Sequence, residues 1–167
     1  MLGNPRNLPD GNLPWTKSCL VCGEHNPRGF KLRARLENGR VIAEYTTKHH
    51  DVGYKHLVHG GIIMTLLDEL MTWAAILETG KVCVAAEMTS RLREPVAVGH
   101  RLRIEAWVSK NARRIILAEA RALDAETGSV LNEATGKYIP IVSEQATFHA
   151  TDFVNDLSTI PPEKILL

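Results

Sequence analysis

Alternating apolar and polar residues predict β-strands on both sides of the longest apolar stretch of the chain. Before that stretch, "FKLRARL" (30–36), the turn "ENG" (37–39) and the return "VIAEY" (41–45) predict a hairpin. After it, four more strands are predicted at residues 82–93, 101–110, 114–123 and 129–141. Because the turns between consecutive strands are short, we expect an antiparallel meander.

The apolar stretch itself, residues 62–77, is typical of a helix. It is too long for a strand and contains neither proline nor glycine, and Gly80 stands where a helix often ends. One helix and one sheet make two layers, so we predict an α+β fold in which the sheet buries one face on the helix. The predicted domain covers residues 30–142, after an irregular N-terminal arm (1–29) and before a C-terminal tail (143–167).

The two faces of this helix differ in character. At 100° per residue, one face carries large apolar residues and is expected to meet the sheet: Ile63, Leu66, Leu67, Leu70, Ala74 and Leu77. The opposite face carries small residues, two hydroxyls and one carboxylate: Gly61, Thr65, Asp68, Thr72 and Ala75. A solvated face would carry Lys, Glu or Gln, so this pattern predicts close approach of another chain or a ligand.

Composition and charge are those of an ordinary globular protein. Hydrophobic residues make up 44% of the chain and charged residues 23%, and the net charge of +1 gives no reason to expect nucleic acid or an anionic membrane as partner. No uncharged apolar run reaches about 18 residues, so no membrane-spanning segment is expected. The N-terminus lacks an apolar signal core and three cysteines make no disulfide framework, so we expect a cytoplasmic protein.

The helix is preceded by "HGG", His59-Gly60-Gly61, which has a chemical interpretation. Backbone N–H groups at a glycine-rich helix N-terminus can hold a carbonyl oxygen that becomes an oxyanion. A carboxylate such as Asp68, set in an apolar helix, could then act as general base or nucleophile in acyl transfer. The alternative is structural: a tight entry turn followed by a hydrogen-bonded surface aspartate.

The spacing of these groups adds a constraint. Gly60 and Asp68 are eight residues apart, which is about 12 Å along a helix axis. One thioester carbon cannot contact both groups of the same helix. Two antiparallel helices related by a twofold axis could bring Gly60 of one copy to Asp68 of the other. The chemical interpretation therefore requires at least a homodimer with composite sites.

The stretch "VHGGIIMTLLDE" (58–69) and the strand order over residues 30–142 resemble the hotdog-fold acyl-CoA thioesterases, especially the phenylacetate-degradation (PaaI-like) type. "CLVCGEHNPRGFKL" (19–32) also resembles a lead-in found in one bacterial branch. The resemblance implies an antiparallel sheet of five to six strands wrapped around one long central helix. It also implies a homodimer or a dimer of dimers that hydrolyses acyl-CoA without a cofactor.

The resemblance assigns roles at the matching positions. Gly60 corresponds to the glycine whose N–H polarises the thioester carbonyl, and Asp68 to the acidic base or nucleophile. His59 corresponds to the histidine that shapes the loop, and Gly61 to the second glycine of the motif. Two polar helpers of the family are replaced here, because Gly53 stands where Asn or Gln is common and Ala85 where Ser or Thr is common. His50, His56 or Thr72 could substitute for them. The substrate-binding residues that we predict are Thr65, Thr72, His56, Arg91 and Arg93, the two arginines as partners of a nucleotide 3′-phosphate.

Three other motifs have more than one interpretation. Cys19-x-x-Cys22 with His25 could begin a zinc site that His49 or His50 completes, but no second regularly spaced pair follows, so we predict packed cysteines and no metal. Lys110, Arg113 and Arg114 cluster at a turn and could equally meet a phosphate or simply be solvated. "GSVLNEATGKY" does not have P-loop spacing and lies in a strand pattern.

The sequence thus predicts an acyl-CoA thioesterase. Two alternatives stay open, and the departures at Gly53 and Ala85 motivate the first: a non-catalytic acyl-CoA binding or sensing module on the same fold. The second is an enoyl-CoA hydratase, whose chemistry usually requires an Asp/His pair that the HGG–Asp arrangement resembles less. Acyl-CoA and further copies of the chain are the expected partners.

Overall fold

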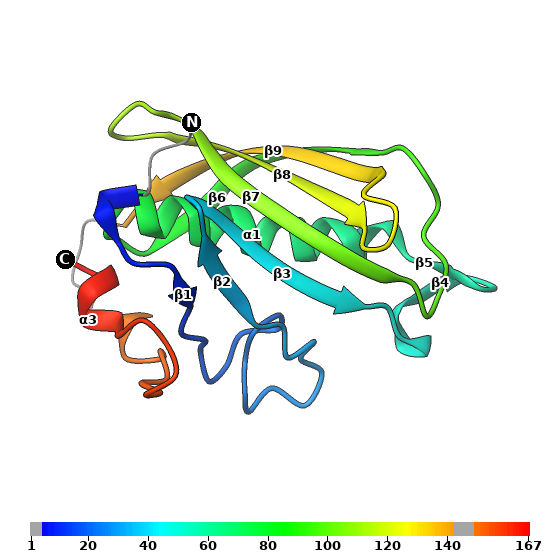
Figure 1. Ribbon diagram of the computed structural model, residues 1–167, viewed down its shortest axis with the longest axis horizontal. Coiled ribbons are helices and arrows are strands. Elements are labelled where there is room, and N and C mark those ends of the chain that lie inside the picture. Colours follow the sequence, from blue (N-terminus) through cyan, green and yellow to red (C-terminus); the bar gives the residue numbers. More distant parts are fainter. Residues whose placement is uncertain (1–4, 142–148) are drawn as a thin grey trace.

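A computed structural model describes residues 5–141 and 149–167 and shows one long helix beneath a large curved sheet (Figure 1). The helix, α1, spans Gly60–Thr79. The seven-stranded sheet has the order β1-β2-β3-β7-β8-β9-β6, and every neighbouring pair is antiparallel. Its strands are β1 (Gly11–Asn12), β2 (Ala34–Glu37), β3 (Arg40–Thr46), β6 (Cys83–Leu92), β7 (Arg101–Asn111), β8 (Ile116–Asp124) and β9 (Val130–Pro140). The α+β prediction is confirmed.

Smaller elements lie around this frame. A two-stranded sheet, β4 (Val52–Tyr54) with β5 (Leu57–Val58), forms within the histidine-rich segment that leads to α1. Among the described residues there are also two short 3-10 helices, η1 (Pro5–Asn7) and η2 (His49–Asp51), and the one-turn helix α3 (Pro162–Ile165).

The buried side chains of α1 form the centre of the core. All six residues of the predicted sheet-facing stripe are buried, at 0–5% exposure. The helix is longer than residues 62–77 at both ends, because His59 caps its N-terminus and Gly80, with φ 70, forms the left-handed C-cap. By length and composition α1 could also cross a membrane, contrary to the expectation from sequence, but core helices packed under a sheet meet the same criterion.

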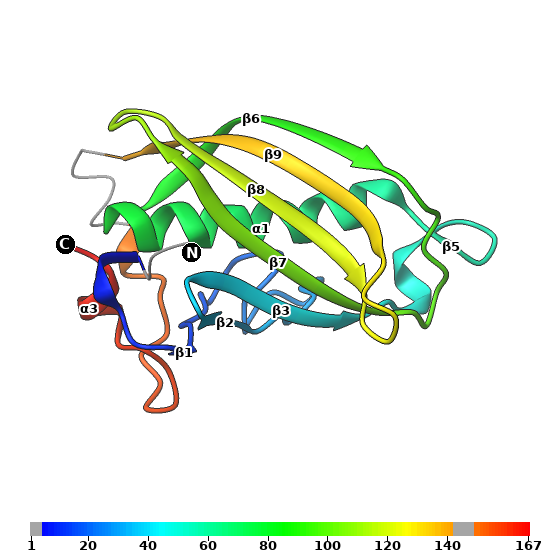
Figure 2. The ribbon, with the colours of Figure 1, turned by 45° about the horizontal axis from the view of Figure 1, so that its top comes forward.

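The predicted four-strand meander is only partly right. Strands β7, β8 and β9 pair in chain order, but β6 pairs with β9 and lies at the far edge of the sheet (Figure 2). The segment between β6 and β7 therefore crosses from that edge to the centre, held by hydrogen bonds from the Val58 N–H to the Val96 carbonyl and from the Val98 N–H to the His56 carbonyl, both 2.8 Å. The outer edge of β6 has no strand beside it in the described chain.

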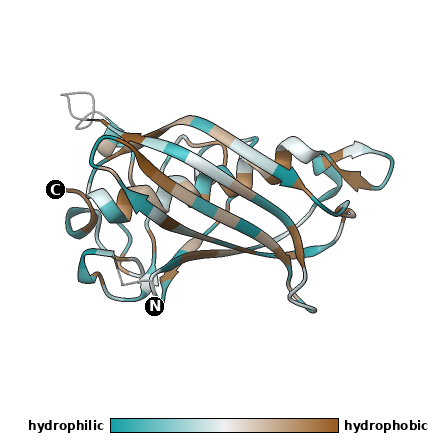
Figure 3. Cartoon of the chain, turned by 90° about the horizontal axis from the view of Figure 1, so that it is seen from above, coloured by the Kyte–Doolittle hydropathy of each residue, from teal (hydrophilic) through white to brown (hydrophobic). Residues whose placement is uncertain are grey.

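The N-terminal arm is more than an irregular extension. It contributes β1 to the sheet, and Leu13 and Val21 are buried in the core. The first strand of the predicted hairpin begins at Ala34 instead of residue 30. In the C-terminal tail, Ile165 is buried, whereas residues 143–148 lie outside the described residues. Seen from above, the strands carry apolar and polar positions in alternation (Figure 3), as a sheet with one covered face requires.

Candidate functional site

The HGG turn forms the N-terminus of α1. The Gly61 N–H donates to His59 Nδ1 at 2.9 Å, so the histidine side chain caps the helix. The Ile62 N–H donates to the His59 carbonyl at 2.9 Å. The Gly60 N–H has no acceptor within the described part of the chain. The turn therefore leaves one backbone donor open at the positive end of the helix dipole.

A side chain at either motif glycine would meet a neighbouring side chain. A Cβ at Gly60 would lie 2.5 Å from Leu92 Cδ1, and a Cβ at Gly61 would lie 2.9 Å from His59 Nδ1. Gly53, on β4, is equally constrained, because a Cβ there would lie 2.8 Å from His59 Cα. The residue that departs from the family pattern thus supports the capping histidine by making room for it.

Asp51 holds the HGG turn in place through hydrogen bonds. Its carboxylate is buried at 3% exposure and accepts from the Tyr45 hydroxyl at 2.8 Å and from the Lys48 N–H at 2.7 Å. Its carbonyl accepts from the His59 N–H at 2.8 Å. Burial and the neighbouring carboxylate raise the pKa of Tyr45. The start of α1 is therefore fixed to the end of β3.

Asp68 lies against the sheet rather than on a face turned away from it. The Tyr138 hydroxyl of β9 donates to Asp68 Oδ1 at 2.7 Å, and Ala75 of the same predicted face is fully buried. Burial and the Asp68 charge raise the pKa of Tyr138, so the phenol stays protonated and donating. Part of the helix face expected to meet another chain or a ligand is therefore covered by the sheet, which wraps far enough for β9 to reach this flank of the helix.

The Tyr138 ring is positioned by a glycine on its own strand. A Cβ at Gly136 would lie 2.6 Å from Tyr138 Cε2, so the ring lies over the bare backbone of Gly136. These two residues belong to "TGKY", the segment rejected as a P-loop, and β9 confirms the strand interpretation. Sequence reasoning missed Tyr138 as a site residue. A glycine two positions before an aromatic residue on one strand face was the available signal.

The hydroxyls and histidines predicted near the site differ in placement. The Thr65 hydroxyl donates to the Gly61 carbonyl at 2.8 Å, within the helix. Thr72 lies close enough to Tyr138 to lessen the rise that burial causes in the pKa of its hydroxyl, and so it lies near the Asp68 group. His50 and His56 are exposed, and no hydrogen bond links either imidazole to Asp68 in the described chain.

The predicted arginines lie on the other side of the sheet. Arg91 lines a hollow of about 350 Å³ on the outer face together with Trp107 and Arg121. Arg93 pairs with Glu133 at 2.5 Å. Within one chain, neither is brought to Asp68. The cluster at 110–114 contributes Arg113 and Arg114 to a separate hollow of about 590 Å³ beyond the C-terminal half of α1.

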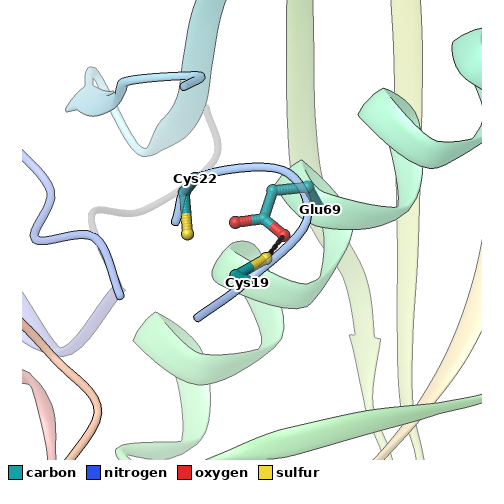
Figure 4. A group of neighbouring side chains, drawn as sticks. All are labelled: Cys19, Cys22 and Glu69. Carbon is teal, nitrogen blue, oxygen red and sulfur yellow. Dashed lines mark hydrogen bonds between the residues drawn. The ribbon is translucent and has the colours of Figure 1, made fainter. Parts of the chain in front are cut away.

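The second carboxylate of α1, Glu69, faces the N-terminal arm (Figure 4). The Cys19 thiol donates to Glu69 Oε2 at 3.5 Å, and the Trp73 Nε1–H donates to Oε1 at 3.3 Å. Burial raises the pKa of Glu69 to about 8. Cys22 completes the cluster, whereas His25 and the two histidines of η2 are not part of it. Sequence spacing could not reveal that a helix residue meets the two cysteines.

Comparison with solved structures identifies the fold. The structure of zebrafish thioesterase superfamily member 2 is similar with a TM-score of 0.61 at 21% identity, over 66% of this chain and 82% of that one. The PaaI protein of the E. coli phenylacetic acid degradation operon is similar with a TM-score of 0.63 at 17% identity, over 68% and 82%. A Streptococcus mutans protein solved with acetyl-CoA bound has a TM-score of 0.59 at 20% identity, over 64% and 84%. The architecture is the hotdog fold.

The sequence itself matches the family model of the thioesterase superfamily over residues 55–131, from just before the HGG turn to the start of β9. No curated protein was matched by sequence. The chain has the hotdog fold, and its residues 55–131 are similar to the thioesterase superfamily. The hotdog fold predicted from the HGG–Asp motif and the strand order is confirmed, and the match over residues 55–131 agrees with the predicted family.

The contact of Gly53 with His59 predicts that restoring the more common family residue disturbs the turn. In Gly53→Asn the new Cβ meets the His59 backbone, so we expect the free energy of unfolding to fall by about 1–3 kcal/mol. Tyr54→Asn places the same side chain one position later, where the residue is 70% exposed, and should change stability by less than about 0.5 kcal/mol. Urea unfolding of both variants measures this. Equal stability of the two variants would contradict the packing role of Gly53.

The Tyr138–Asp68 contact predicts a measurable coupling energy. Tyr138→Phe removes the buried hydroxyl and should lower the free energy of unfolding by about 1–3 kcal/mol. Tyr54→Phe removes an exposed hydroxyl and should have almost no effect. In a double-mutant cycle with Asp68→Ala, the coupling should be about 0.5–3 kcal/mol. Additive effects would show that the hydrogen bond does not hold Asp68.

Proposed function

We propose that this protein hydrolyses the thioester of an acyl-CoA at a site built from two copies of the chain. The observation that carries this is the pairing, on one helix, of an open Gly60 N–H with a carboxylate fixed by Tyr138. The family match and the acetyl-CoA bound to a structural neighbour support the substrate class.

The reaction follows from what each group offers. The Gly60 N–H, at the positive end of the α1 dipole, receives the thioester carbonyl oxygen and stabilises the negative charge that develops there. The Asp68 carboxylate takes a proton from a water molecule as the water oxygen bonds to the carbonyl carbon. When the tetrahedral intermediate collapses, the C–S bond breaks and the sulfur leaves as the CoA thiolate, which takes up a proton. Tyr138 acts as a positioning residue for Asp68.

Two copies are needed because of distance. Eight residues separate Gly60 from Asp68, or about 12 Å along α1. The free edge of β6 suits assembly, since its residues are mostly exposed and include Val84 at 48% and Leu92 at 49%. Pairing of β6 with its symmetry mate would extend the sheet and bring two α1 helices together in antiparallel orientation. Gly60 of each copy would then approach Asp68 of the other.

A non-catalytic acyl-CoA binding module is the second candidate. It is favoured by the contact of Gly53 with His59, which leaves no room for the amide side chain common in the family at that position. Ala85, where a hydroxyl was expected, lies on β6 opposite Tyr138 and offers no polar group. The shared site would then bind the thioester without activating water. Turnover separates the two candidates.

The test is release of free thiol from a panel of short, medium, long and aromatic acyl-CoAs. Wild type should hydrolyse at least one class, and Asp68→Asn should lose about 10²–10⁴-fold in kcat with a small change in KM. Asp10→Asn, the same change at an exposed carboxylate of the N-terminal arm, is the matched control and should retain wild-type kinetics. Thiol release by Asp68→Asn at the wild-type rate would contradict the mechanism. Saturable binding without turnover would favour the binding module.

A further inference from the structure

Three metal-ligating side chains meet at the junction of the N-terminal arm and α1. Cys19 and Cys22 come from one turn of the arm, and Glu69 comes from the middle of the helix (Figure 4). One ligand atom from each, the two Sγ atoms and a carboxylate oxygen, lie within 4.8 Å of one another. The thioester chemistry above uses none of these three residues.

The turn that carries the cysteines is shaped to present both sulfurs on one side. The Gly23 N–H donates to the Cys19 carbonyl at 3.0 Å, and a Cβ at Gly23 would lie 2.1 Å from that oxygen, so only glycine fits. The Val21 N–H donates to Cys19 Sγ at 3.2 Å. A backbone donor aimed at sulfur stabilises a thiolate, which is the form that binds metal. The "CLVCG" sequence therefore specifies a preformed pair of sulfur ligands.

The cluster has no compensating cation among the described residues. Glu69 takes part in none of the ion pairs found among the described residues, and its hydrogen bonds come from a thiol and an indole. Holding a carboxylate in this partly buried position without a positive partner costs free energy. A divalent cation would remove that cost and would favour the ionised forms of all three ligands.

We propose that Cys19, Cys22 and Glu69 bind one Zn²⁺ ion. Two thiolates and one carboxylate are a donor set that suits zinc, whereas magnesium and calcium prefer oxygen alone. The fourth position of a tetrahedral ion would face the adjoining cavity of about 250 Å³, whose wall includes Ser18, Thr72 and Asp152. The ion fastens the N-terminal arm to the central helix.

This site would also stiffen the neighbourhood of Asp68. Glu69 is the next residue of the helix, and Thr72, which lines the cavity, lies close enough to Tyr138 to lessen the rise that burial causes in the pKa of its hydroxyl. The proposal does not depend on thioester hydrolysis, because metal binding is measured without substrate. Its failure and the failure of the proposed function are therefore distinguishable.

The test is metal content and Co²⁺ spectroscopy on the full chain under reducing conditions. Wild type, freed of metal and reconstituted, should bind one Zn²⁺ per chain, and Co²⁺ should give thiolate-to-cobalt charge-transfer absorption. Loss of an outer-shell partner already costs about 10–100-fold in affinity, so Cys22→Ser and the isosteric Glu69→Gln should each weaken binding by at least about tenfold. A chelator should lower the melting temperature of wild type and leave that of Cys22→Ser unchanged.

Cys83→Ser is the matched control. Cys83 is a buried thiol on the same cavity wall, but its Sγ contacts Thr79 and the Lys81 carbonyl instead of the cluster. It should bind zinc as wild type does. Reduced, folded wild type that takes up no Zn²⁺ or Co²⁺ would overturn the proposal, and so would zinc binding that Glu69→Gln and Cys22→Ser both leave intact. Formation of a Cys19–Cys22 disulfide in place of metal uptake would overturn it as well.

Discussion

A helix that is apolar on more than one side must be covered on more than one side, and this constraint shapes the whole molecule. Ten of the twenty residues of α1 are buried, and fully burying one large aliphatic side chain contributes about 1.5–3 kcal/mol. One flat face of a sheet could not cover them. The neighbouring strands β3, β7, β8, β9 and β6 therefore curve around the helix (Figures 1 and 2). The N-terminal arm packs against the flank of the helix that holds Trp73 and Glu69.

The candidate site is a consequence of the same helix. Its N-terminus supplies the open Gly60 N–H. Its middle supplies Asp68, on the side of β9, and Glu69, on the side of the N-terminal arm. Because the helix is rigid, the separation of Gly60 and Asp68 cannot be closed within one chain. The two adjacent carboxylates that look equivalent in sequence thus have different surroundings, a tyrosine hydroxyl for one and two thiols for the other.

Local patterns were sufficient for much of this architecture. The spacing of apolar residues predicted the helix, its buried stripe and the six longest strands, but not β1, β4 and β5. The HGG–Asp spacing predicted a resemblance to the thioesterase superfamily, whose model matches residues 55–131. These features depend on neighbours in sequence. The position of β6 was not predictable in this way, because the length of the segment between β6 and β7 does not determine at which edge of the sheet β6 lies. The Tyr138–Asp68 bond joins residues 70 apart, and the Cys19–Glu69 contact joins residues 50 apart. Both depend on how far the sheet and the arm wrap around α1.

The central claim is that Gly60 and Asp68 act together across two chains, and subunit mixing tests it most directly. Gly60→Pro removes the backbone N–H, and proline is a residue that helix N-termini accept. Leu92→Ala in the same chain makes room for the proline ring. Leu92→Ala alone is the control that must stay active. Gly60→Pro/Leu92→Ala and Asp68→Asn should each be inactive.

After the two inactive proteins are dissociated and reassembled together, half of the dimers should be mixed, with one intact site of two. The account predicts recovery of about a quarter of the activity of Leu92→Ala. No recovery from a mixture shown to contain mixed dimers would mean that both groups act within one chain, and it would contradict the account.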